Sequence, residues 1–215
     1  MKKAKAHQRY LTSKGEPCVG VTTVLGKIAK PYLITWANKL GLDGIDSTKY
    51  VDGLADIGTL IHYLIECDCK GTTPELGDYS QNDIVTARFG LQKWLNWKAL
   101  NKFELIDSEL QIVSDDLRVG GTCDIYAKVN GKFSVMDIKT SKATYAEQRT
   151  QGIAYKKLLE ANGKQVDEAR IIRVGRNENE GFDDILIGAE ELHWKRFLIY
   201  LEAYRADKNL ENAGG

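Results

Sequence analysis

The sequence predicts an α/β fold in which helices flank a mixed central β-sheet, with a helical cap formed by the N-terminal part of the chain. Two apolar runs rich in β-forming residues, 123–129 and 133–138, flank Asn130-Gly131, a dipeptide typical of a two-residue hairpin turn. Apolar residues recur with helical spacing on both sides of this hairpin. The resulting order of helices, strands, a helix, further strands and a last helix indicates one sheet covered by helices, and 215 residues are enough for one such domain.

Residues 1–45 are interpreted as an N-terminal arm and the helical cap. Residues 10–20 predict a short hairpin or loop, and a helix is expected to open near Val21. A second short helix is expected over residues 32–40. Its Trp36 could stack on a nucleic-acid base, but a core position is the favoured interpretation.

Two long amphipathic helices are expected next, over residues 47–70 and 82–101. The first ends at Gly71, a residue typical of helix C-termini. Its apolar side chains form one stripe, made of Leu54, Ile57, Ile61, Leu64 and Ile65. The large apolar side chains of the second helix are interpreted as core contacts rather than a base-stacking surface, and they are Phe89, Trp94, Trp97 and Leu100.

Strands and shorter helices complete the chain around the hairpin. The predicted strands cover residues 103–113, 118–129, 132–139, 169–174 and 184–187. The predicted helices cover residues 143–159 and 190–204. The whole chain, 1–215, is therefore expected to form one domain, with its core over 46–206 and a tail over 207–215 whose last residues are disordered.

The composition excludes several classes of protein. Lys and Arg together number 30, as do Asp and Glu, and the formal net charge of zero argues against a simple polycation that coats nucleic acid. The four cysteines have neither zinc-finger nor iron–sulfur spacing and are interpreted as reduced thiols. The chain starts without the apolar segment of a signal peptide, and no apolar run approaches the ~20 residues of a membrane span. A cytoplasmic protein without membrane contact is expected.

Three charged residues in the predicted hairpin indicate a chemical site. Asp137 and Lys139 are two residues apart on one strand, so their side chains point to the same face of the sheet, and Asp124 lies on the partner strand. Hard divalent cations prefer oxygen ligands, so the two carboxylates could share Mg²⁺ or Mn²⁺, with the carbonyl of Ile138 as a further ligand. The alternative is an ordinary ion pair at a strand end.

Four fragments in this order give the chain a family resemblance. They are Gly58-Thr-Leu-Ile-His62, Gly120-Gly-Thr-Cys-Asp124, Asp137-Ile-Lys139 and Gln151-Gly-Ile-Ala-Tyr155. The chain resembles the RecB-like exonuclease branch of the PD-(D/E)xK nuclease superfamily, which includes phage nucleases and the mitochondrial genome maintenance exonuclease. The resemblance covers most of residues 20–160 and implies a restriction-endonuclease-like fold, with the N-terminal helices as a cap over the active site.

The resemblance also implies metal ligands outside the hairpin. His62 would bind the metal, and an imidazole ligand suits Mn²⁺ better than a site made only of oxygens. Glu66, four residues later on the same helix face, would assist His62 or bind a second metal, although a solvated glutamate is equally consistent with the pattern. Glu109 would support the metal site, but a register shift of one residue would turn it to the other face of the sheet.

The resemblance assigns further roles near the scissile phosphate. Lys139 would orient the attacking water and neutralise the charge that develops on the phosphate. Gln151 and Tyr155 share a helix face and would orient the substrate, with ordinary helix surface and core as the alternatives. Thr140 and Ser141 directly follow Lys139 and could donate hydrogen bonds to a phosphate.

Taken together, these features predict a DNA exonuclease that depends on Mg²⁺ or Mn²⁺ and leaves a 5′-phosphate. The expected substrate is linear DNA, single- or double-stranded, and the expected setting is phage or bacterial recombination, repair or turnover, inside the bacterial host if the protein is phage-encoded. A recombination protein or a single-strand-binding protein is the expected protein partner. Two alternatives stay open: a structure-specific endonuclease of the same superfamily, and a non-catalytic DNA-binding descendant of the fold.

Overall fold

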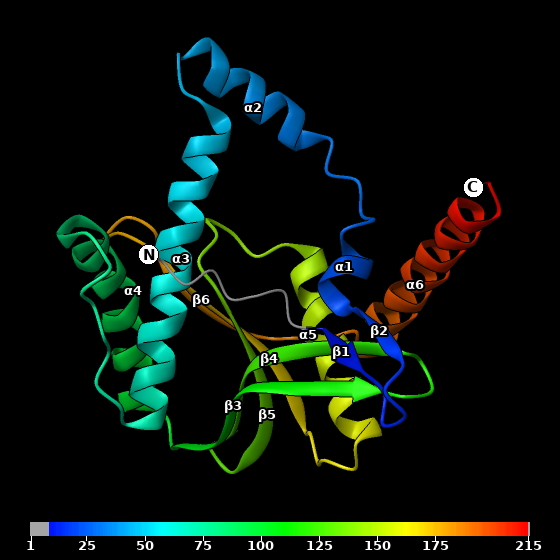
Figure 1. Ribbon diagram of the computed structural model, residues 1–215. Helices are drawn as coiled ribbons and strands as arrows, with labels where there is room; N and C mark the ends of the chain where they lie inside the picture. The colour runs from blue at the N-terminus through cyan, green and yellow to red at the C-terminus, as the bar shows by residue number, and fades with distance from the viewer. Residues whose placement is uncertain (1–8, 215) are drawn as a thin grey trace.

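The computed structural model describes residues 9–214, and residues 1–8 of the predicted arm and Gly215 lie outside the described residues. Figure 1 shows a central sheet with helices packed on it. The strands are β1 (Tyr10–Leu11), β2 (Pro17–Gly20), β3 (Phe103–Ser114), β4 (Val119–Val129), β5 (Lys132–Lys139), β6 (Glu168–Val174) and β7 (Phe182–Leu186). The helices are α1 (Val21–Leu25), α2 (Tyr32–Leu42), α3 (Ser47–Lys70), α4 (Gln81–Leu100), α5 (Ala146–Ala161) and α6 (Glu190–Ala213).

The sheet of the described residues has seven strands and is mixed. Its order is β1-β2-β4-β5-β6-β7, and β3 pairs with β4 outside this path. The β2–β4 and β5–β6 pairs are parallel, whereas the other pairs are antiparallel. The predicted fold class, a mixed central sheet flanked by helices as in restriction-endonuclease-like folds, is confirmed.

Local chemistry explains the boundaries that the sequence predicts well. Asn130 and Gly131 have φ of 52° and 85°, the positive values that a type I′ hairpin turn requires between β4 and β5. The Asp46 side chain accepts hydrogen bonds from the amides of Thr48 and Lys49 and so caps the N-terminus of α3. Gly71 ends α3 in the left-handed conformation at φ 66°.

Helices cover both faces of the sheet, and each face has its own core. On one face α1, α5 and α6 pack around buried sheet residues such as Val135 and Ile171. On the other face α3 and α4 pack around Met136, Ile172 and the fully buried Trp94. The core position predicted for Leu100 on α4 is wrong, since its exposed fraction is 86%. Within residues 9–214 no helix has the length and apolar character needed to cross a membrane.

One edge of β4 is interrupted, and this interruption positions the candidate site. β3 pairs with β4 from residue 119 to residue 129 and therefore occupies one edge along the whole strand. On the other edge, β2 pairs with residues 119–120 and β5 pairs with residues 125–129. Residues 121–124 consequently lack a strand partner on this edge in the described part of the chain. Gly121, Thr122 and Asp124 line a pocket at this open edge, whereas Cys123 is buried in the core.

The α2 helix stands apart from the core. Figure 1 shows it bridging the segment after α1 and the N-terminal end of α3, away from the sheet. None of its residues is buried, and the exposed fractions of Ile34 and Leu42 are 75% and 81%. The core position predicted for Trp36 is wrong, since its exposed fraction is 36%. The apolar composition of this segment is typical of a packed helix, but nothing in residues 9–214 buries it.

Two helices, α5 and α6, differ from the sequence prediction by three residues or more at one end. The α5 helix begins at Ala146 rather than residue 143, because the Gln148 side chain accepts a hydrogen bond from the Tyr145 amide and sets the N-terminus there. The α6 helix continues through Ala213, so the region predicted as a tail is helical over 207–213. Ion pairs between Lys27 and Asp207 and between Lys208 and Glu211 help to extend the helix.

Candidate functional site

The two aspartates of the hairpin lie side by side where β4 and β5 diverge. The last paired residues before this point are Ile125 and Met136, and continuing their register by one residue sets Asp124 opposite Asp137. Beyond the last paired residues, the Asp124 carboxylate accepts a hydrogen bond from the Ile138 amide at 2.7 Å. The carboxylate thus takes the place of a β4 backbone carbonyl as the partner of this amide. Asp137 is 2% exposed, so the site holds a carboxylate that is almost fully removed from water.

Lys139 pairs with the buried aspartate, as the spacing of the two residues predicts. Its Nζ lies 2.6 Å from Oδ2 of Asp137. Burial raises the pKa of Asp137 to about 6, with Lys139 opposing and Asp124 adding to the shift. Burial alone would lower the pKa of Lys139, but the charges of Asp137 and Asp124 outweigh it and raise that pKa. The ammonium of Lys139 is therefore held in its charged form.

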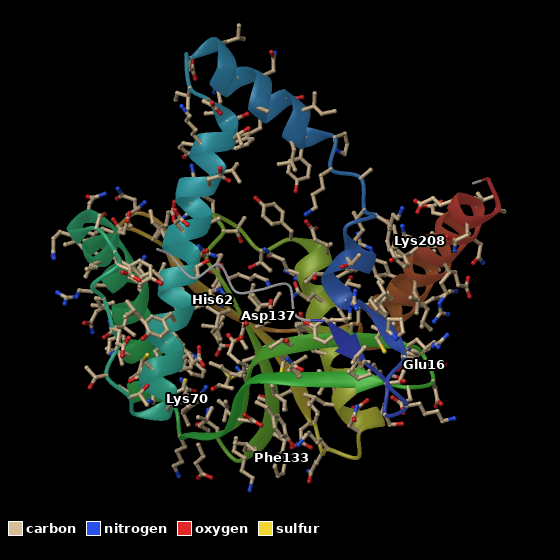
Figure 2. The ribbon with its side chains drawn as sticks, in the orientation of Figure 1. Glu16, His62, Lys70, Phe133, Asp137 and Lys208 are labelled. Carbon is tan, nitrogen blue, oxygen red and sulfur yellow. The ribbon has the colours of Figure 1, made fainter. Side chains whose placement is uncertain are left out.

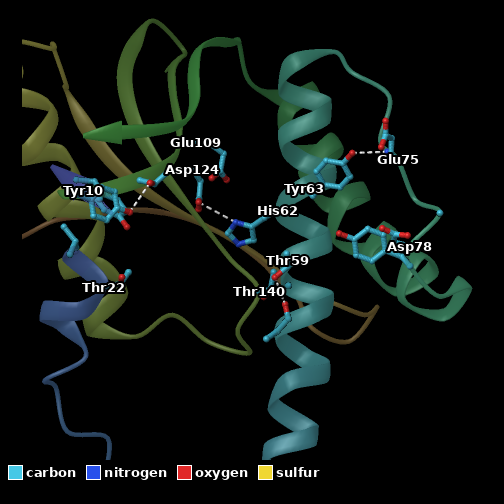
Figure 3. A pocket seen from close by; sticks show the side chains of 18 residues that line it. Tyr10, Thr22, Thr59, His62, Tyr63, Glu75, Asp78, Glu109, Asp124 and Thr140 are labelled. Carbon is cyan, nitrogen blue, oxygen red and sulfur yellow. Dashed lines mark hydrogen bonds and ion pairs between the residues drawn. The ribbon is translucent and has the colours of Figure 1, made fainter. Parts of the chain in front are cut away.

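His62 reaches the same site from α3, in the other helical layer. Its Nδ1 lies 3.6 Å from Oδ1 of Asp124, a contact that Figure 3 marks with a dashed line. Burial would lower the pKa of His62, but the Asp124 carboxylate raises it, and His62 in turn helps to lower the pKa of Asp124 against the effect of burial. Gly58 allows the close approach of α3, because a Cβ at this position would lie 2.9 Å from Oγ1 of Thr140. Figure 2 shows His62 and Asp137 in the interior between the helices.

A chain of side-chain hydrogen bonds links the sheet to α5. Lys139 donates to Oε1 of Gln151 at 3.1 Å, and Nε2 of Gln151 donates to the hydroxyl of Tyr155 at 2.9 Å. Burial raises the pKa of Tyr155 well above its usual value, so its hydroxyl keeps its proton. A Cβ at Gly121 would lie 2.5 Å from the Tyr155 ring, and this glycine therefore makes room for the ring beside the open edge of β4.

Glu109 lines the pocket beside Asp124 because of an unusual backbone conformation. Its φ is 52°, a left-handed value that a glutamate seldom adopts. The register of β3 against β4 also shifts between Leu105 and Asp107. Figure 3 shows the Glu109 side chain near Asp124 and His62. The direction that the sequence left open is therefore toward the pocket.

Two residues proposed from the sequence have other partners. The Glu66 carboxylate pairs with Lys70 at 2.6 Å on the surface of α3 and does not line the pocket. The Ser141 hydroxyl donates to the carbonyl of Ala143 at 2.7 Å and accepts from Gln148, so it fixes the loop after β5. Thr140, in contrast, lines the pocket directly.

The pocket beside Asp124 has a volume of about 890 Å³. It includes residues that no sequence pattern marked as functional, notably Tyr10, Tyr63 and Tyr79. The hydroxyl of Tyr10 hydrogen-bonds to Oγ1 of Thr122 at 3.1 Å, across 112 positions of the chain. Of the sequence features, only Gly120-Gly121 indicated a close contact here. A Cβ at Gly120 would lie 2.5 Å from the Tyr10 side chain.

The candidate ligands are neighbours without forming a closed cluster. Across residues 9–214, no three His, Cys, Asp or Glu side chains are gathered closely enough to hold a metal ion as they stand. His62 and Asp124 face each other, whereas Asp137 is engaged by the ammonium of Lys139. The residues nevertheless suit a hard or borderline divalent cation in kind, because they offer two carboxylates and one imidazole, with the Ile138 carbonyl on the same strand as Asp137.

Comparison with known proteins finds no matching family model and no matching curated protein. Among solved structures, the chain is similar to SSO0001 at 12% identity over 84% of this chain and 74% of that chain, with a TM-score of 0.36. It is also similar to an alkaline exonuclease, LHK-Exo from Laribacter hongkongensis, at 14% identity over 75% of this chain and 91% of that chain, with a TM-score of 0.34. A structure of LHK-Exo in complex with dAMP gives 13% identity, 92% and 94% coverage, and a TM-score of 0.37. All three TM-scores are below 0.5, so the overlap with these structures is partial.

Proposed function

We propose that this protein is a metal-dependent deoxyribonuclease that hydrolyses phosphodiester bonds, acting as an exonuclease on linear DNA. One observation carries the proposal: a buried carboxylate, its neighbouring carboxylate and a charged lysine meet at the open edge of β4, at Asp137, Asp124 and Lys139. Buried charges that are compensated only in part are costly to the fold and cluster at functional sites, and this group supplies two carboxylates and a cation of the kind that metal-dependent phosphate hydrolysis uses. The four sequence fragments shared with RecB-like nucleases support the same conclusion.

The metal would be held by Asp124 and Asp137, with His62 and the Ile138 carbonyl as further ligands and Glu109 in support. The raised pKa of Asp137 fits this role, because it reflects a buried negative charge that its surroundings compensate only in part. When bound, Mg²⁺ or Mn²⁺ would polarise the phosphate and lower the pKa of a bound water. The imidazole of His62 favours Mn²⁺ over a site made only of oxygen ligands.

The remaining residues would contact the phosphate of the substrate or hold the side chain that does. The ammonium of Lys139, kept charged by its carboxylate neighbours, would neutralise the charge that develops on the phosphate. Gln151 holds this ammonium from the α5 side and so fixes its direction. The hydroxyl oxygen of Tyr155 accepts a hydrogen bond from the Gln151 side-chain amide, and the hydroxyl retains its proton. Tyr155 can therefore donate this proton in a hydrogen bond to a phosphate oxygen.

The proposal is tested by incubating linear DNA with Mg²⁺ or Mn²⁺ and with the wild type, Asp137→Ala and Lys139→Ala. Each substitution is expected to slow degradation by a factor of about 10² to 10³, the usual cost of removing one group that stabilises the transition state. Lys132→Ala is the matched control, because Lys132 lies on the same strand with 64% of its side chain exposed. Degradation by both alanine variants at the wild-type rate would show that the proposed site is wrong.

Circular single-stranded DNA separates the exonuclease from the alternative endonuclease. An enzyme that needs a DNA end leaves the circle intact under conditions in which it degrades the linear strand. Cutting of the circle would reject strict end dependence and favour a structure-specific endonuclease with the same catalytic residues. Metal-dependent binding without cleavage of either substrate would favour the non-catalytic descendant.

A further inference from the structure

A second pocket, of about 410 Å³, lies next to the lysine of the proposed site. Its lining includes Lys139 and Gln151, whose other contacts belong to the site described above. The pocket also contains Lys30, Tyr32 and Tyr145, which come from the segment before α2, from α2 itself and from the residue before α5. A group bound here would therefore lie directly beside the proposed reaction centre.

The two tyrosine rings in this pocket form a stacked pair. The rings of Tyr32 and Tyr145 are nearly parallel, at 14°, and their centroids are 6.2 Å apart. A flat base stacked on both faces needs ring spacings of ~6.8 Å, twice the ~3.4 Å rise of stacked bases. The centroid spacing of the two rings is shorter than this, so Tyr32 has to move for a base to enter between them. The exposed fractions of Tyr32 and Tyr145, 49% and 37%, keep both rings accessible.

The surroundings of the two rings suit a nucleotide. Lys30 pairs with Glu147 at 3.0 Å, so the linker before α2 is tied to the N-terminal turn of α5 and an ammonium stands at the pocket. Because α2 has no buried residue, a small shift of Tyr32 that widens the gap disrupts no packed core. Aromatic stacking of this kind accepts any base and needs that base to be unpaired.

We infer that Tyr32 and Tyr145 clamp one unpaired base next to the scissile phosphate, and that this clamp makes the protein select single-stranded DNA. The inference deepens the proposed nuclease function and rests on it for the identity of the neighbouring site. Both faces of a base inside a duplex are covered by its stacked neighbours, so such a base must unstack and leave its pair before it can enter between two rings. Single-stranded ends should consequently be bound and cut in preference to duplex ends.

The clamp is tested with single-stranded oligonucleotides that carry one 2-aminopurine at successive positions, since stacking quenches the fluorescence of this base. Binding is measured in EDTA and again with Ca²⁺ in place of Mg²⁺. Quenching is expected at one position with the wild type and with Tyr145→Phe, which keeps the ring. Quenching should be lost, and binding should weaken about tenfold or more, with Tyr32→Ala or Tyr145→Ala. Truncation at Tyr145 leaves the start of α5 intact, because its amide, not its ring, bonds to Gln148.

Tyr50→Ala is the matched control. Tyr50 is also 36% exposed and contacts Trp36 on the same projecting region, but those two rings are tilted by 54° and cannot hold a flat base between them. Equal loss of quenching in Tyr50→Ala, or no quenching at any position in either buffer, would overturn the clamp.

The clamp and the proposed activity can fail separately. Cleavage of linear DNA by the wild type, with quenching unchanged when both tyrosines are replaced by alanine, would overturn the clamp and leave the nuclease proposal standing. Ring-dependent quenching in a protein that cleaves no DNA would support the clamp and contradict the nuclease proposal.

Discussion

The β4–β5 strand pair and the α2 helix border the same proposed site and are built in opposite ways. Along β5, the exposed fractions of Met136, Asp137 and Ile138 are 0%, 2% and 1%. Along α2 no residue is buried, although the helix carries several large apolar side chains. The difference indicates two roles: the buried sheet holds the charged groups in fixed positions, whereas the helix that carries Tyr32 would be able to adjust to a ligand.

The contrast should be largest in the free energy of unfolding. Trp94 is fully buried, and its indole donates a hydrogen bond to Asp68 at 2.7 Å, so Trp94→Ala should cost about 3 to 5 kcal/mol. Trp36→Ala, on α2, should cost no more than about 0.5 kcal/mol. Urea denaturation of both variants measures the two values. Similar costs would show that α2 is packed against the protein in solution.

The buried carboxylate should make stability depend on pH. The pKa of Asp137 in the folded protein is about 6, above the ~3.9 of an unfolded chain, so the folded state retains a proton that the unfolded state has released. The stability of the wild type should therefore fall relative to Asp137→Asn by about 1 to 3 kcal/mol as the pH rises from about 4 through 6. Urea midpoints in EDTA across this range test the sign. A difference that stays constant with pH would mean that Asp137 is not buried as described.

Replacing a glycine by alanine should also affect stability differently at the buried sheet and at the exposed start of α3, by smaller amounts. Gly121→Ala should cost about 1 to 3 kcal/mol by overpacking, because the new methyl group would meet the Tyr155 ring. The shifted ring would also disturb the hydrogen bond to Gln151 and slow DNA cleavage. Gly53→Ala, in the exposed first turns of α3 with no atom within 4 Å of the new Cβ, should stabilise the protein by about 0.5 to 1 kcal/mol. Thermal melting and cleavage rates of both variants provide the check.

Features set by local chemistry could be predicted from the sequence. The hairpin follows from Asn130-Gly131, and the same-face placement of Asp137 and Lys139 follows from the two-residue period of a strand. The end of α3 follows from Gly71. In each case the residues that determine the structure are neighbours in the chain.

Features set by distant contacts could not be predicted in this way. The direction of Glu109 depends on a register shift and a left-handed backbone that no local pattern announces. Tyr10 enters the pocket through a partner 112 residues away. The exposure of Trp36 on α2 was missed because an apolar helix has the same composition whether or not the rest of the chain buries it.

The most direct test of the central claim is where a metal binds. Crystals soaked in Mn²⁺ and measured for the anomalous scattering of manganese would locate the ion without any assumption about activity. The account predicts a peak contacted by Asp124, Asp137 and His62, with the Lys139 ammonium displaced from the Asp137 carboxylate. A peak elsewhere, or crystals with Lys139 still on Asp137 and no manganese beside it, would contradict the account.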